Sequence, residues 1–183
     1  GDKGNAAAIG AIDDLSATYK GDRRWRIEHA QIVDPKDFAR FGQNGVIASV
    51  QPVHQTSDRT MAEARLGPDR LAGAYPWKSL QAAGAKLAFG SDAPVEQADP
   101  WAGFAAAISR QGPDGQPTGG WQPQERVDRA TALAAYTSGA AFAGFAEKRF
   151  GRLAPGLRAD FIVVDTDPMS ASPEQIRATK VIE

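Results

Sequence analysis

The chain has 183 residues, of which 42% are hydrophobic and 23% are charged, the balance of a globular unit with one sizeable core. Its net charge of −1 gives no basic field for nucleic acid, and the absence of cysteine excludes disulfides, thiolate metal sites and a cysteine nucleophile. No apolar run approaches the roughly 20 residues of a membrane helix. We expect neither a nucleic-acid partner nor a membrane partner, favour a cytoplasmic location and leave a homo-oligomer open.

The first part of the chain predicts a helix followed by a strand. Residues 6–19 place Ile9 and Leu15 on one helical face, and Asn5 is the predicted N-cap. The stretch 25–29 is short and apolar enough for a strand, and it ends on a histidine.

A second helix and a second strand come next. Asp34, followed directly by proline, predicts a helix start, and Phe38 and Phe41 supply the face that packs. Residues 46–50 are almost continuously apolar, which is typical of a strand covered on both faces. This strand leaves through a segment that ends at His54, which the sequence places at the strand exit.

The third strand carries the carboxylate of greatest interest. Asp58 is the predicted N-cap of an intervening helix, Tyr75 is interpreted as a packing residue, and residues 77–83 predict another short helix. Residues 86–89 then form an apolar strand that stops on a glycine and presents Asp92. A carboxylate at the exit of a buried strand is suited to holding a cation or moving a proton.

The last part of the chain predicts two further helices. Asp99-Pro100 repeats the signal of a helix start, and Asp128 is the predicted N-cap of an alanine-rich helix that runs to about residue 145 with a break near Gly139. Residues 111–123 form a Gly- and Pro-rich loop. The apolar face of the first of these helices is Trp101, Phe104, Ala105 and Ile108.

Strands that alternate with helices predict an α/β fold with parallel strands and helical crossovers. His29, His54 and Asp92 all lie at or just past the carboxyl ends of these strands. In parallel α/β folds this is the edge where sites are built.

Four segments, in this order, resemble one family. They resemble the amidohydrolase superfamily, and within it the branch of N-substituted formamide deformylases and YtcJ-like metal-dependent hydrolases. The segments are Arg26–Gln31, Ala74–Leu80, Leu87–Asp92 and Gly151–Asp165.

The resemblance implies a (β/α)8 TIM barrel joined to a small β-sandwich domain. Residues 1–149 would hold barrel strands six to eight, and residues 150–183 would be the segment that returns to the sandwich. The family's His-x-His motif of the first strand and its ligands on the fourth and fifth strands have no counterpart here. We therefore expect an N-terminal barrel half, in the same chain or a separate one, as a partner, and expect only the intact protein to be active.

The resemblance also assigns roles to the three candidate residues. His29 and Asp92 would bind a divalent metal, most simply zinc as one or two ions, and Asp92 would also be the catalytic proton acceptor. The second ring nitrogen of His29 would then be fixed by a hydrogen-bond acceptor. His54 would be a substrate or oxyanion contact. Without the resemblance, each residue also has a structural interpretation: a core histidine, a turn-capping aspartate and a loop histidine.

The implied activity is hydrolysis of C–N bonds other than peptide bonds, with a small amide or N-substituted formamide as substrate. One alternative is a deaminase of the same superfamily that uses the same aspartate. The other is a non-catalytic regulatory or binding protein on a degenerate barrel. An upstream His-x-His motif would separate the enzyme interpretations from the last one.

Overall fold

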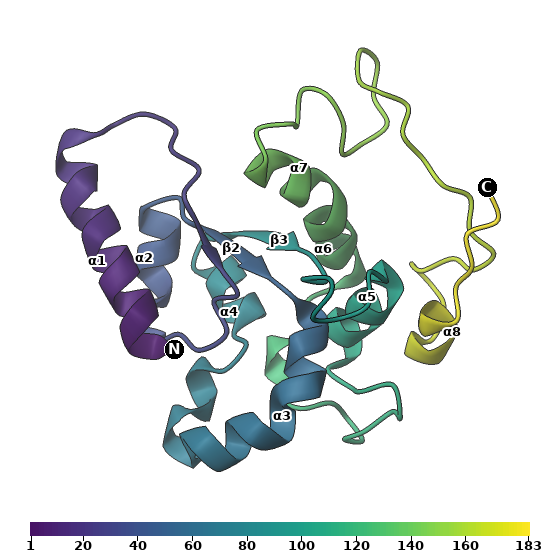
Figure 1. Cartoon of the computed structure of the whole chain (residues 1–183), viewed down its shortest axis with the longest axis horizontal. Helices are drawn as coiled ribbons and strands as arrows, with labels where there is room; N and C mark the ends of the chain where they lie inside the picture. The colour runs from purple at the N-terminus through teal and green to yellow at the C-terminus, as the bar shows by residue number, and fades with distance from the viewer.

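The computed structural model describes residues 1–183 and places a three-stranded sheet among helices (Figure 1). The strands are β1 (Arg26–Glu28), β2 (Ile47–Val50) and β3 (Lys86–Phe89). The α-helices are α1 (Asp2–Thr18), α2 (Phe38–Gln43), α3 (Pro52–Leu66), α4 (Trp77–Ala82), α5 (Pro100–Ser109), α6 (Arg129–Ala134), α7 (Ala140–Ala143) and α8 (Pro173–Arg177). The shorter turns are η1 (Pro35–Asp37), η2 (Pro68–Gly73), η3 (Pro123–Glu125) and the π-helical η4 (Ala135–Gly139). No helix combines the length and the apolarity that crossing a membrane requires.

All neighbouring strands of the sheet run parallel, in the order β1-β2-β3. The predicted α/β class with parallel strands is therefore confirmed. The ladder continues one residue past the strands, because His29 N donates to Ser49 O at 2.7 Å and Gly90 N donates to Val50 O at 3.1 Å. The carboxyl ends of all three strands consequently meet at one edge of the sheet.

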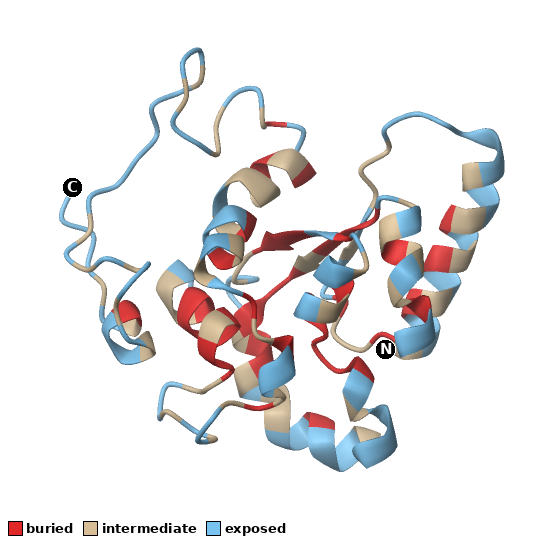
Figure 2. Cartoon of the chain, turned by 180° about the vertical axis from the view of Figure 1, so that it is seen from behind, coloured by how far each residue is buried: buried red, intermediate tan, exposed pale blue.

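The two faces of the sheet are buried to different extents. Ala48, Val50, Leu87 and Phe89 are buried in the main core, with Ile27 packed against them. Figure 2 shows this burial concentrated in the strands and in the facing sides of the helices.

The alternate residues of the outer strands point the other way, and Arg26, Glu28 and Lys86 are exposed. The expectation of cover on both faces was made for residues 46–50, and it is met in β2, whose Ile47 is fully buried beside Ala88.

Three of the predicted helix starts form as expected. The carboxylates of Asp34, Asp99 and Asp128 each accept a hydrogen bond from a backbone N–H in the first turn of the following helix, at 2.7–3.1 Å. These bonds satisfy donors that a helix end leaves without partners.

Two predicted caps are wrong. Asn5 lies inside α1, and its amide donates to Ile32 O at 2.6 Å, so it ties the helix to the loop after β1. Asp58 lies inside α3, because that helix begins at Pro52, the residue type favoured at a first helical position.

Leu15 was expected to be buried but is 49% exposed near the end of α1.

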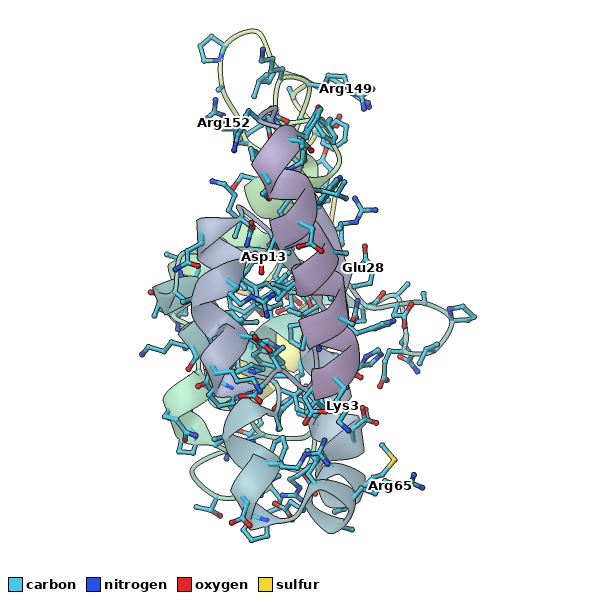
Figure 3. The ribbon with its side chains drawn as sticks, turned by 90° about the vertical axis from the view of Figure 1, so that its left-hand side faces the viewer. Lys3, Asp13, Glu28, Arg65, Arg149 and Arg152 are labelled. Atoms are coloured by element: carbon cyan, nitrogen blue, oxygen red, sulfur yellow. The ribbon has the colours of Figure 1, made fainter.

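Helices α1 and α2 are joined by polar side chains. Asp13 lies between the two helices in Figure 3, and it accepts hydrogen bonds from Arg40 Nε at 2.9 Å and Asn44 Nδ2 at 2.7 Å. The buried side of α1 is formed by Ile9 and Ile12. The first helix is thus held to the sheet domain by both apolar and charged contacts.

The C-terminal part departs from a regular helix at the predicted position. In place of a break near Gly139, the backbone widens into η4 between α6 and α7. Residues 150–183 contain α8 and a single antiparallel bridge between Val164 and Val181, and most of the segment before α8 is exposed (Figure 2). The assignment of these residues to a sandwich domain remains a prediction.

The close packing of α2 against the end of α4 can be tested by a substitution at one glycine. A Cβ atom on Gly42 of α2 would overlap the backbone oxygen of Ala83, at the close approach of α2 to the end of α4. We expect Gly42→Ala to lower the free energy of unfolding by about 1–3 kcal/mol or more, since the overlap is with backbone. Urea titration measures this difference.

The matched control is Gly4→Ala. Gly4 is also helical, and a Cβ there meets no atom within 4 Å. Alanine should be neutral or stabilising by up to about 1 kcal/mol at this position. Equal effects of the two substitutions would contradict the close packing of α2 on α4.

Candidate metal and catalytic site

Three side chains converge at the carboxyl edge of the sheet. His29 Nδ1 lies 3.9 Å and His54 Nε2 lies 4.0 Å from Asp92 Oδ2. The two imidazole rings are stacked with centroids 5.9 Å apart, and one ligand atom from each of the three residues lies within 4.8 Å of the others. The structure therefore brings together the three residues that the sequence singled out, while their chemical roles remain predictions.

The backbone at the strand ends is unusual. His29, Ala30 and Asp92 have φ angles of 69°, 40° and 61°, in the left-handed region that non-glycine residues seldom adopt. At these residues the chain leaves the extended geometry of the strands. Residues held in such conformations cluster at functional sites, and here they carry two of the three converging side chains.

His54 reaches the site from a helix and not from the loop that the sequence suggested. It lies in the first turn of α3, which follows β2 directly. Only 7% of the residue is exposed, and its Nε2 atom is buried without a hydrogen-bond partner. An unpartnered buried nitrogen of this kind is unfavourable unless something binds it.

The surroundings of His29 suit a metal ligand. Its Nδ1 lies 2.9 Å from Gln51 Oε1. With the amide oxygen on that side, Nδ1 donates and Nε2 keeps a free lone pair. This is the arrangement that holds a metal-binding histidine in one orientation. The carboxylate of Asp92 adds an oxygen ligand to the nitrogen ligand of His29. Such a mixed set of ligands fits zinc and similar divalent ions.

The surroundings of His54 are different. Gln31 Nε2 lies 3.2 Å from His54 Nδ1 and 3.4 Å from Asp58 Oδ2, and Asp58 Oδ2 also accepts a 2.7 Å hydrogen bond from the Tyr75 hydroxyl. Burial, followed by the hydrogen bond to Asp58, raises the pKa of the Tyr75 hydroxyl. Tyr75 therefore stays protonated and donates.

Three residues of the site were missed or misread from the sequence: Asp58 was interpreted as a helix cap, and no site role was predicted for Gln31 or Gln51. Tyr75 packs in the core as expected, and its hydroxyl also donates to Asp58. The available signal was position, since each glutamine follows a strand closely. His29, Gln31, His54 and Asp58 line a pocket of about 250 Å³ together with Val95 and Glu96 from the loop after β3.

Comparison with known proteins identifies the family. The model of the amidohydrolase family matches residues 2–183, and the chain belongs to that family. The predicted membership of the superfamily is thus confirmed.

Three relatives illustrate the match. LONG AFTER FAR-RED 3 of Arabidopsis thaliana is 36% identical over 181 residues, covering 98% of this chain and 31% of that protein. YtcJ of Bacillus subtilis, named as an amidohydrolase, is 32% identical over 190 residues, covering 98% of this chain and 36% of YtcJ. The N-substituted formamide deformylase of Arthrobacter pascens is 29% identical over 108 residues, covering 59% of this chain and 19% of the deformylase. The chain spans about a third of the length of the first two relatives.

A solved structure agrees with the fold. An uncharacterised metal-dependent hydrolase from Pyrococcus horikoshii is 32% identical and superposes with a TM-score of 0.80. The match covers 94% of this chain and 34% of the other.

The hydrogen bond between Tyr75 and Asp58 can be tested through stability. Tyr75→Phe removes a donor from a charged acceptor, and such bonds contribute about 1.5–3 kcal/mol. We expect a decrease in the free energy of unfolding toward the lower end of this range, because Asp58 keeps its contact with Gln31. Denaturant titration measures it.

Tyr136→Phe is the matched control. Tyr136 is a partly buried tyrosine whose pKa is raised by burial and then by the charge of Asp99, with no hydrogen bond contributing. Its substitution should change the free energy of unfolding by less than about 0.5 kcal/mol. A Tyr75→Phe effect no larger than this control would show that the hydroxyl contributes nothing at Asp58.

Proposed function

We propose that the protein carrying this chain is a metal-dependent hydrolase that acts on C–N bonds other than peptide bonds, in small amides or N-substituted formamides. The observation that carries the proposal is the convergence of His29, His54 and Asp92 at the carboxyl edge of a parallel sheet in an amidohydrolase-family chain. The similarity to a formamide deformylase supports the choice of substrate class.

His29 and Asp92 are the proposed metal ligands. His29 would bind through Nε2, the nitrogen that Gln51 leaves free, and Asp92 through a carboxylate oxygen. Without a metal, the His29 nitrogen that lies 3.9 Å from Asp92 Oδ2 is Nδ1. Zinc is the proposed metal, as one or two ions, since zinc sites use both imidazole nitrogen and carboxylate oxygen as ligands. When bound, such an ion lowers the pKa of water and polarises a carbonyl group.

Asp92 is also the proposed proton carrier. Its side chain is partly exposed, beside both imidazoles, where a water molecule and the scissile bond can approach it. The carboxylate takes a proton from the attacking water and delivers it to the departing nitrogen, so that the amine leaves neutral. His54, which lines the adjoining pocket together with His29, contacts the substrate.

The proposed architecture of the whole protein is a (β/α)8 barrel with a small sandwich domain. In it β1, β2 and β3 are strands six to eight within residues 1–149, and residues 150–183 belong to the sandwich. The outer edges of β1 and β3 have no strand partner in this chain, and such edges favour pairing with further strands. The remaining strands, from the same or a separate chain, would supply the other metal ligands, so activity requires the intact protein.

Removal of His29 tests metal binding. In the intact protein, His29→Ala should lower bound metal and hydrolysis together, because a catalytic zinc usually holds three protein ligands and loses one of them. Elemental analysis of purified protein measures the metal, and amine release from a panel of small amides measures activity. Glu28→Ala is the control, since Glu28 is exposed and pairs only with Arg26. Full metal occupancy in an active His29→Ala protein would show that His29 is not a metal ligand.

Substitution of Asp92 by asparagine tests proton transfer. Asp92→Asn keeps the shape of the side chain but removes the proton acceptor. We expect near-normal folding, retained or weakened metal binding and a kcat lowered by roughly 10²–10⁴-fold. Steady-state kinetics measures kcat. The control is Asp69→Asn, because Asp69 is an exposed aspartate on η2. Unchanged turnover would leave Asp92 as a turn residue.

A further inference from the structure

We infer that Tyr75, Asp58 and Gln31 fix His54 with its proton on Nε2, so that His54 is a hydrogen-bond donor to the substrate and not a third metal ligand. The role toward substrate rests on the proposed function, whereas the position of the proton rests on the structure alone. Tyr75, Asp58 and Gln31 are hereafter called the Tyr75 network, and they act as positioning residues through His54.

Tyr75 forms the buried end of the network. Tyr75 is a donor toward Asp58, as shown by the 2.7 Å distance between its hydroxyl and Asp58 Oδ2. An ionised carboxylate can only accept hydrogen bonds. Whatever else approaches Asp58 Oδ2 must therefore donate to it.

This requirement orients the amide of Gln31. The group 3.4 Å from Asp58 Oδ2 must be the NH₂ of Gln31, since an amide oxygen there would face a carboxylate. The same nitrogen lies 3.2 Å from His54 Nδ1. An NH₂ group has two hydrogens, one for each of these neighbours.

The orientation of Gln31 then decides the tautomer of His54. Because Gln31 donates to Nδ1, that nitrogen must offer a lone pair, and the proton of the neutral imidazole lies on Nε2. Nε2–H is buried without an acceptor, and Asp92 Oδ2 at 4.0 Å is too distant for a hydrogen bond. A substrate oxygen that becomes negative during the reaction would supply the missing acceptor.

The two histidines thus carry opposite tautomers in one site. Gln51 presents its oxygen to His29 and leaves Nε2 of His29 free for a metal, whereas Gln31 presents its nitrogen to His54 and leaves a proton on Nε2. A metal ligand needs a lone pair, so the proximity of three donor atoms does not make a three-ligand site. Proximity alone would have assigned His54 to the metal.

Nitrogen NMR of the histidine side chains tests the inference on the intact, metal-free protein. His54→Asn identifies the signals of His54, and the wild type should show protonated Nε2 and unprotonated Nδ1. Gln31→Glu keeps the size of the side chain but replaces the donor with an acceptor. We expect the proton of His54 to move to Nδ1, and zinc affinity to rise by roughly 10- to 100-fold as Nε2 becomes a ligand.

Gln51→Glu is the matched control. It places the same new charge on the partner of the other histidine but keeps an acceptor there, so the tautomer of His54 should not change. If Gln31→Glu does not fold, Gln31→Leu takes its place, and removal of the donor should give a mixture of His54 tautomers. A wild-type His54 protonated on Nδ1, or a tautomer unaffected by loss of the Gln31 donor, would overturn the inference. The NMR readout needs no substrate, so failure of the proposed hydrolysis would be recognised separately.

Discussion

Parallel pairing of the three strands is the constraint on which the site depends. Each backbone bond of the ladder fixes where the next residue leaves the sheet, and the bonds made by His29 N and Gly90 N continue that ladder to the edge. Residues more than 60 positions apart in the chain therefore emerge side by side. A register slip of one residue in either pair would turn the side chains to the opposite face, and the imidazoles and the carboxylate would no longer meet.

Amide side chains then give chemically identical histidines different properties. Gln31 and Gln51 occupy similar positions after β1 and β2, yet one offers nitrogen and the other offers oxygen to its histidine. Asp58, a carboxylate acceptor, accounts for the orientation of Gln31. Buried polar groups of this kind are costly when partly satisfied, so the members of the Tyr75 network depend on one another.

Local signals predicted three helix starts correctly, and the two caps that failed belong to helices that begin earlier in the chain. Asp34, Asp99 and Asp128 were recognised as caps because the cap bond lies within a few residues of sequence. The cap predicted at Asn5 is wrong because α1 already begins at Asp2, and the cap predicted at Asp58 is wrong because α3 begins at Pro52. The pairing of His29 with Asp92 followed from strand order, but no periodicity could show which atom of Gln31 faces His54.

The left-handed backbone at His29 and Asp92 has a consequence for selection. A non-glycine residue in this conformation stores about 1–3 kcal/mol of strain, and glycine at either position would release part of it while deleting a side chain of the site. If these side chains act as proposed, screens that reward thermal resistance would select glycine at these two positions together with a loss of activity. The left-handed backbone and the proposed chemistry therefore place opposite demands on the residue at these two positions.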